Sequence, residues 1–129
     1  MFINLSNHPS DRWSEEQRKA ALELSQKLGA HIGQASTIND IPFPNINPRA
    51  DKAAIEEIAD QYFGQIHSQS TPSTTAVHVM GEMTCTLAII RRLLAHGYTC
   101  VAATSERNTI ENSDGTKLTT FNFVQFRPY

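Results

Sequence analysis

The sequence lacks several features that identify common protein classes. It has only two cysteines in 129 residues, Cys85 and Cys100, and they form no CxxC unit. A disulfide framework is therefore excluded, and reduced buried thiols are expected. No apolar run approaches the roughly 18 residues of a membrane span, and residues 1–6 do not resemble a signal peptide. We expect a cytoplasmic protein that does not bind a membrane.

The chain also has little excess of either charge sign, and common catalytic motifs are missing. The formal net charge is -2 and the sequence pI is near 6.2, which gives no general attraction to duplex nucleic acid. The sequence contains no GxGxxG, GxxxxGKS/T, GxSxG or HExxH motif. Dinucleotide binding, P-loop hydrolysis, serine hydrolysis and zinc protease chemistry therefore lose their usual support, and we expect no metal and no other cofactor.

The residues that are present alternate between strand and helix patterns. Residues 2–5 predict a first strand, and residues 6–10 predict a loop. Ser14 and Gln17 form a capping box at the start of a helix that Gly29 ends. The apolar face of this helix consists of Ala21, Leu24 and Leu28.

The middle of the chain predicts a weak strand and a strong helix. Residues 35–41 favour a second strand, although the apolar pattern is weak, and residues 41–48 contain three prolines that favour a stiff, extended connector. Asp51 is an expected N-cap, and residues 68–75 connect two elements. The expected helix has apolar positions at Ile55, Ile58, Tyr62 and Ile66.

The last part of the chain predicts a parallel strand pair followed by a hairpin. Residues 76–80 and 98–103 favour buried strands, joined by a turn at 81–84 and a helix over 85–96. Asp-Gly at 114–115 is typical of a hairpin turn. In the partner strand, Phe121 and Phe123 lie on one face and Val124 and Phe126 on the other, which predicts that both faces are covered.

These elements predict one domain over residues 1–129. Its fold class is a single-domain Rossmann-like α/β sandwich, with a mostly parallel sheet flanked by helices and a C-terminal antiparallel β-hairpin.

Polar residues follow three of the expected parallel strands, where ligands bind in open α/β sheets. They are Ser6, Asn7 and His8; Gly81, Glu82 and Thr84; and Thr104, Ser105, Glu106 and Arg107. We therefore predict a polar pocket lined by Asn7, His8, Glu82 and Arg107.

Each member of this pocket has two interpretations. His8 transfers a proton, or it only hydrogen-bonds the loop backbone. Glu82 contacts a ribose hydroxyl or acts as a general base, or it complements the positive end of the next helix. Arg107 clamps a phosphate or stabilises a transition state, or it pairs with Glu106 or Glu111 at the surface.

The remaining candidates also have a structural interpretation. Asn7 is a ligand donor or a turn residue. Thr84, Thr104 and Ser105 are suitable phosphate donors or ordinary loop residues. His78, at the centre of a buried strand, is interpreted as a packed and satisfied histidine.

Several segments together carry a family resemblance. They are residues 4–8 before a glutamine-bearing helix, 79–82, 104–107 before an acidic Asp-Gly hairpin, and the ending over 123–129. With them the chain resembles the small CRISPR-associated ring nucleases of Rossmann-like, CARF-like fold. The resemblance spans most of the chain and is weakest over residues 29–73.

The resemblance implies an intracellular homodimer that binds cyclic oligoadenylates, the second messengers of type III CRISPR immunity, and cleaves them to end the antiviral response. It implies no single catalytic residue. It places the ligand over Ser6, Asn7, His8, Gly81, Glu82, Thr84, Thr104, Ser105 and Arg107.

Our leading expectation is a metal-independent ring nuclease for cyclic tetra-adenylate, in which a ribose 2′-hydroxyl attacks its neighbouring phosphate. His8 or Glu82 then assists proton transfer, and Arg107 stabilises the phosphorane. A non-catalytic cyclic-nucleotide sensor or sponge, and an unrelated enzyme of nucleotide or sugar-phosphate metabolism, stay open as alternatives.

Overall fold

The protein is described by a computed structural model that covers residues 1–29 and 37–129. The strands are β1 (Phe2–Ser6), β2 (Ile38–Pro42), β3 (Ala76–Met80), β4 (Thr99–Glu111) and β5 (Lys117–Pro128). The helices are α1 (Glu15–Lys27), α2 (Lys52–Gln69) and α3 (Met83–Ala95), with short 3-10 turns at Ser10–Arg12 and Pro72–Thr74. None of the described helices is long and apolar enough to cross a membrane.

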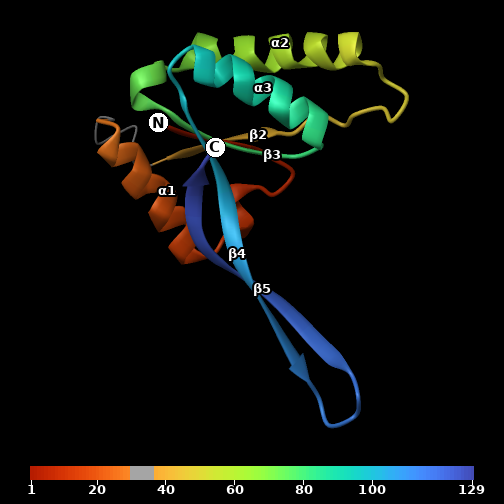
Figure 1. Cartoon of the computed structure of the whole chain (residues 1–129). Coiled ribbons are helices and arrows are strands. Elements are labelled where there is room, and N and C mark those ends of the chain that lie inside the picture. Colours follow the sequence, from red (N-terminus) through yellow and green to blue (C-terminus); the bar gives the residue numbers. More distant parts are fainter. Residues whose placement is uncertain (30–36) are drawn as a thin grey trace.

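The strands form one sheet in the order β2-β1-β3-β4-β5. The first four strands are parallel, and β5 is antiparallel to β4. Helix α1 covers one face of the sheet, whereas α2 and α3 lie together on the other face (Figure 1). The predicted fold class is therefore confirmed. Because the chain goes from β1 outward to β2 and then returns to β3 on the other side of β1, the sheet changes winding direction between β1 and β3.

Two of the predicted helix starts are confirmed by their capping bonds, whereas α3 begins at Met83, two residues before the predicted start at residue 85. The hydroxyl of Ser14 accepts a hydrogen bond from the Gln17 amide, and the Asp51 carboxylate accepts one from the Ala54 amide. Gly29 follows α1 with φ of +83°, a conformation that glycine adopts without steric strain.

The second strand begins later than the sequence indicated. It starts at Ile38 and includes Pro42, one of the residues predicted to form the connector. Proline fits there because β2 is an edge strand, where one side needs no ladder hydrogen bond. Residues 35 and 36 of the predicted strand lie outside the described residues.

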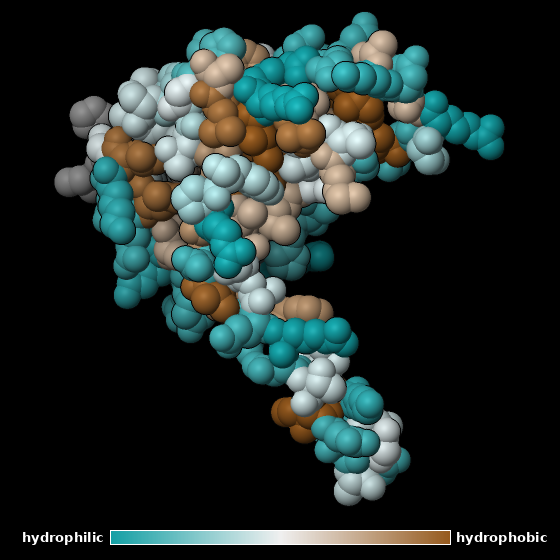
Figure 2. Space-filling view, viewed as in Figure 1, coloured by the Kyte–Doolittle hydropathy of each residue, from teal (hydrophilic) through white to brown (hydrophobic). Residues whose placement is uncertain are grey.

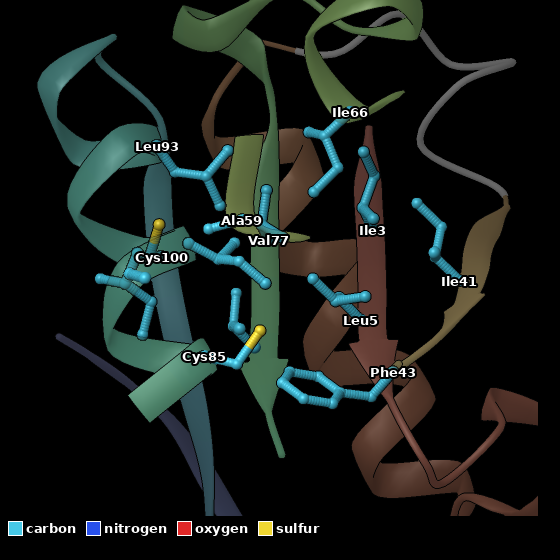
Figure 3. Packing of buried hydrophobic residues seen from close by; sticks show 14 of the residues in the cluster. Ile3, Leu5, Ile41, Phe43, Ala59, Ile66, Val77, Cys85, Leu93 and Cys100 are labelled. Atoms are coloured by element: carbon cyan, nitrogen blue, oxygen red, sulfur yellow. The ribbon is translucent and has the colours of Figure 1, made fainter. Parts of the chain in front are cut away.

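The face under α2 and α3 carries the main apolar core (Figure 3). Ile3, Leu5, Val77 and Val79 project from β1 and β3 and are fully buried. Both cysteines are free and buried, as predicted, and burial raises the pKa of the Cys100 thiol to about 12.

The Pro-rich segment after β2 supplies one ring to this core. Phe43 packs against Gly81 so closely that a Cβ atom at position 81 would lie 2.4 Å from the ring. Gly81 therefore has a packing role at the end of β3.

The face under α1 carries a smaller aromatic cluster. Phe2, Trp13, Ala21, Ala76 and Val101 are its buried members. Phe126 packs against it, with its ring centroid 5.1 Å from that of Phe2 and 5.8 Å from that of Trp13.

The strand β4 does not end at Ala103, as the sequence indicated. It continues to Glu111, and residues 104–107 lie inside it, because β5 pairs with it from Val101 to Glu111. The two strands form a hairpin that projects away from the sheet and the helices (Figure 1).

The prediction that both faces of this hairpin are covered was wrong. Ile110, Leu118, Phe121 and Val124 are each half exposed or more, and apolar side chains show on the projecting part (Figure 2). The register shifts between Thr104 and Ser105. This shift brings Phe126 to the face of Phe123, with ring centroids 5.0 Å apart, instead of the opposite face.

Candidate functional site

A cavity of about 610 Å³ lies beyond the carboxyl ends of β1 and β3, against residues 103–105 in the middle of β4. This is where the sheet changes winding direction, which is the usual ligand position in open α/β sheets. Its volume is within the range of small-molecule sites. The lining residues are Ser6, Asn7, His8, Trp13, Gln17, His78, Met80, Gly81, Ala103, Thr104, Ser105, Phe121 and Phe123.

The wall of this pocket combines aromatic rings with neutral hydrogen-bonding groups. Trp13 comes from the loop before α1, and Phe121 and Phe123 come from β5. Among the described residues that line the pocket, none has a carboxylate side chain. Such a wall suits a flat ring system next to hydroxyl or phosphate groups, since no fixed negative charge opposes an anion.

A second hollow of about 640 Å³ continues from the pocket toward the start of α1. The residues that line both hollows are His8, Trp13, Gln17, Phe121 and Phe123. Arg12 and Glu16 line only the second hollow. The two hollows form one groove between the start of α1 and the hairpin, and both the Arg12 guanidinium and the Glu16 carboxylate line its outer part.

A polar network holds the loop that forms the pocket floor, and Asn4 is its centre. This side chain is 1% exposed. Its amide nitrogen donates to the Asp40 carboxylate at 2.7 Å and to the His8 carbonyl at 2.9 Å. Its amide oxygen accepts from the Ser6 hydroxyl at 2.8 Å and lies 2.9 Å from Nδ1 of His78.

The same network ties the loop to β2 and to Trp13. Asp40 accepts hydrogen bonds from the amide and the hydroxyl of Ser10, at 3.0 and 2.7 Å. The indole nitrogen of Trp13 donates to the His8 carbonyl at 3.0 Å. The backbone of residues 6–10 is therefore fixed, while the side chains of Asn7 and His8 are exposed at the pocket.

His78 differs from the satisfied histidine that the sequence predicted. Its ring lines the pocket and is 3% exposed, with the edges of Trp13 and Phe126 at centroid distances of 5.5 Å. Burial, with a smaller effect of nearby His8, lowers the pKa of His78 to about 4. Nδ1 forms a hydrogen bond with the amide oxygen of Asn4, but Nε2 is buried with no hydrogen-bond partner among the described residues.

The structure brings six of the nine predicted site residues together at the pocket. They are Ser6, Asn7, His8, Gly81, Thr104 and Ser105. Glu82, Thr84 and Arg107 are not among the lining residues.

Glu82 is the N-cap of α3. Its carboxylate accepts hydrogen bonds from the amides of Thr84 and Cys85, at 3.0 and 2.8 Å, and from the Thr84 hydroxyl at 2.7 Å. These bonds, the Cys85 amide first, lower the pKa of Glu82. The geometry matches the alternative in which Glu82 complements the helix start.

Arg107 lies on the hairpin, opposite Phe121 in the β4–β5 register. Cross-strand partners share a face, so Arg107, two residues beyond Ser105, continues the pocket-lining face of the hairpin. In the described part of the chain, its guanidinium forms no ion pair with Glu106 or Glu111.

Sequence reasoning missed several lining residues. Trp13, Gln17, Phe121 and Phe123 were assigned no site role, and Arg12 was not considered. The i, i+2 spacing of Phe121 and Phe123 in a strand was a usable signal, because it places both rings on one face. No cluster of three or more His, Cys, Asp or Glu side chains able to hold a metal ion occurs within residues 1–29 and 37–129.

Comparison with known proteins gives one match. The model of the family described as Uncharacterized protein MJ1673 family matches residues 1–127. No curated protein and no solved structure matches the chain.

Proposed function

We propose a function for this chain, which belongs to the uncharacterized MJ1673 family: it binds cyclic oligoadenylates, cyclic tetra-adenylate above all, and cleaves them without a metal ion. In a cell, this reaction would end type III CRISPR signalling. The observation that carries the proposal is the inner pocket of aromatic and neutral polar residues at the winding change of the sheet.

The composition of the groove supports a nucleotide ligand. The rings of Phe121 and Phe123 offer surfaces on which adenine stacks, and stacking of a base contributes about 1–3 kcal/mol. The hydroxyl of Ser105 is a suitable donor to a phosphate oxygen, whereas the hydroxyls of Ser6 and Thr104 already donate to the Asn4 amide oxygen and the Gln125 carbonyl. The absence of carboxylates from the described lining of the inner pocket favours a phosphodiester over a cationic ligand.

The proposed reaction needs only positioning and proton transfer. The ribose 2′-oxygen forms a bond to the adjacent phosphorus, and the bond from that phosphorus to the 5′-oxygen of the next nucleotide breaks. One proton leaves the 2′-hydroxyl, and one is returned to the 5′-oxygen. The products carry a 2′,3′-cyclic phosphate and a 5′-hydroxyl, so atoms and charge balance.

His8 is the proposed proton-transfer group, because it is exposed at the pocket on a fixed loop. Arg107 and Arg12 are the proposed charge-stabilising groups. Glu82 was expected to share proton transfer, but its carboxylate is engaged at the start of α3. Its proposed contribution is now to hold that helix beside the pocket.

A homodimer completes the proposal. One pocket of about 610 Å³ is small for a ring of four nucleotides. A two-fold axis would present two equal grooves to a symmetric ring. Light scattering on the purified protein, with and without cyclic tetra-adenylate, measures the oligomeric state.

The decisive experiment incubates purified protein with labelled cyclic tri-, tetra- and hexa-adenylate in EDTA and resolves the products. Linear products with 2′,3′-cyclic phosphate ends support the proposal. If the protein neither alters nor retains any of the rings, the nucleotide assignment fails, and an unrelated small-molecule enzyme becomes the better hypothesis.

Matched variants test the assigned groups. His8→Ala should lower the cleavage rate by about 10²–10⁴-fold, the usual range for a lost acid or base, whereas His96→Ala, at the end of α3, should not change it. Arg107→Ala should lower the rate, and Arg49→Ala, in the loop before α2, serves as its control.

The second candidate is a sensor or sponge that binds the ring without cutting it. The observation that favours it is that Glu82 is occupied by capping bonds and that burial keeps His78 weakly basic. His8 then remains as the exposed titratable base among the described lining residues. Recovery of intact ring that co-elutes with the protein would support this candidate.

A further inference from the structure

The hydrogen-bond pattern at Asn4 fixes which atom of its amide faces which neighbour. The Asp40 carboxylate and the His8 carbonyl, which lie on one side, are acceptors only. The amide nitrogen must therefore face them, because an oxygen there would meet two acceptors. The amide oxygen then faces Ser6 and His78.

This orientation in turn fixes the tautomer of His78. The Asn4 oxygen only accepts, so Nδ1 of His78 must carry the hydrogen in their 2.9 Å contact. A neutral imidazole has a single N–H group. Nε2 is therefore a bare nitrogen with a lone pair.

The surroundings of the ring keep it neutral. His78 is 3% exposed, and the edges of Trp13 and Phe126 pack against it. Burial disfavours the imidazolium, which agrees with a pKa of about 4. At neutral pH, the ring is an acceptor at Nε2 and a donor at Nδ1.

The lone pair of Nε2 has no hydrogen-bond donor among the described residues, although the atom is buried. A buried polar atom without a partner destabilises the native state, and most such atoms in native proteins are satisfied. The ring that carries this atom also lines the 610 Å³ pocket. A donor from outside the protein would therefore approach this atom from the pocket side of the ring.

We infer that the bare Nε2 of His78 accepts a hydrogen bond from the ligand of this pocket. The inference rests on the proposed function for the identity of the donor, which is then a ribose 2′-hydroxyl. His78 thereby becomes a positioning residue that distinguishes ribose from deoxyribose. Asn4 and Asp40 act behind it by holding its tautomer.

The tautomer is tested without any ligand. Two-bond ¹H–¹⁵N correlation spectra of the uniformly labelled protein at pH 7 distinguish protonated from bare imidazole nitrogens, and His78→Gln identifies the His78 signals. We expect Nδ1 protonated and Nε2 bare. A proton on Nε2, or a doubly protonated ring, would overturn the inference.

The recognition is tested by ligand binding, for which the chain has a built-in reporter. Trp13 is the only tryptophan, and it lines the pocket. Its fluorescence is titrated with cyclic tetra-adenylate and with the 2′-deoxy ring, read before turnover. The wild type should bind cyclic tetra-adenylate about tenfold more tightly than the 2′-deoxy ring, a difference that corresponds to one good hydrogen bond.

Two substitutions isolate the acceptor. His78→Gln and His78→Phe both lose the Nδ1 contact to Asn4, but only glutamine places an oxygen near the position of Nε2. We expect His78→Gln to keep most of the ribose preference and His78→Phe to lose it. His96→Phe is the control for a general effect of the substitution, and thermal unfolding shows that each variant is folded.

The failures of the two proposals are distinguishable. If the wild type prefers the ribose ring over the 2′-deoxy ring and His78→Phe shows the same preference, the inference is overturned while the proposed function stands. If the wild type binds neither ring, the proposed function fails, and the 2′-hydroxyl assignment fails with it.

Discussion

The two faces of the sheet differ, although the same strands build both. In β1, Ile3 and Leu5 project toward α2 and α3, whereas Asn4 and Ser6 project toward α1. In β3, Val77 projects with the first pair and His78 with the second. Alternation along a strand thus divides an apolar core from a polar network within a few residues.

The difference separates stability from function. The α2/α3 face buries large apolar side chains of α2, α3 and three strands (Figure 3), so it supplies most of the hydrophobic free energy. The α1 face has a smaller apolar cluster and leaves a pocket at the carboxyl ends of the strands. Its buried polar atoms without a hydrogen-bond partner among the described residues include Nε2 of His78 and the hydroxyl of Ser25.

The largest expected effect on the free energy of unfolding comes from comparing substitutions at two neighbouring residues of β1. Leu5→Ala should lower the free energy of unfolding by about 2–5 kcal/mol, because it leaves a cavity in the apolar core. Ser6→Ala, on the other face, should lower it by about 1 kcal/mol through lost hydrogen bonds to Asn4 and His8. Urea unfolding measures both; equal losses would contradict the division.

The second prediction concerns pH. The pKa of His78 is lowered from 6.5 to about 4 in the native protein, so between these values the unfolded chain binds more protons than the native one. The free energy of unfolding should therefore decrease as pH falls from 6.5 toward 4, and this contribution is fully present above pH 6.5. Between pH 7 and 4.5 the loss due to His78 amounts to roughly 2 kcal/mol.

His78→Gln isolates that contribution, because other histidines and carboxylates titrate in both proteins. Urea unfolding at pH 7 and pH 4.5 should give a smaller loss for His78→Gln than for the wild type. Parallel losses would show that the ring is not held neutral by burial.

The α2/α3 face and the helices could be predicted from sequence because local signals specify them. Ser14 and Asp51 cap helices through bonds to residues three positions away, and the apolar spacing after Asp51 marks one helix face. The extent of β4 was not predictable in this way. Its polar residues 104–107 are typical of a loop, and only pairing with β5, distant in sequence, makes them a strand.

The α1 face was less predictable for a related reason. Ser6, Asn7 and His8 follow a recognisable strand, and the rule for parallel sheets places them at the pocket. The importance of His78 depends on Asn4, 74 residues away, and no local pattern indicates that contact. The bulge that turns Phe126 toward His78 is equally absent from the strand periodicity.

The third prediction tests how tightly the apolar face is packed below the pocket. Gly81→Ala should lower the free energy of unfolding by roughly 1–3 kcal/mol, because the new methyl group would overlap the buried ring of Phe43. Adding Phe43→Leu should recover part of that loss. Gly64→Ala in α2, where no described atom apart from its chain neighbours and the adjacent helix backbone lies within 4 Å of the new Cβ, should be neutral or slightly stabilising. An equal loss at both glycines would point to backbone entropy instead of packing.

The smallest expected effect concerns the helices that cover the two faces. Arg92 of α3 bonds Glu56 and Asp60 of α2, at 2.5 and 2.7 Å, whereas the ion pair of α1 joins exposed Lys19 and Glu23 at 3.9 Å. Arg92→Met should lower the free energy of unfolding by up to about 1 kcal/mol, and Lys19→Met should leave it nearly unchanged.

The measurement for this pair is urea unfolding at low and at high salt. Because Asp60 is largely exposed, part of the Arg92 contribution is screened, and the difference between the two variants should shrink as salt increases. A difference that is independent of salt would mean that hydrogen bonds of the guanidinium to the Ala88 and Glu56 carbonyls, which methionine also lacks, supply the stabilisation. The linkage of α2 and α3 would then rest on hydrogen bonds at the edge of the hydrophobic core to which Leu5 contributes from the sheet side.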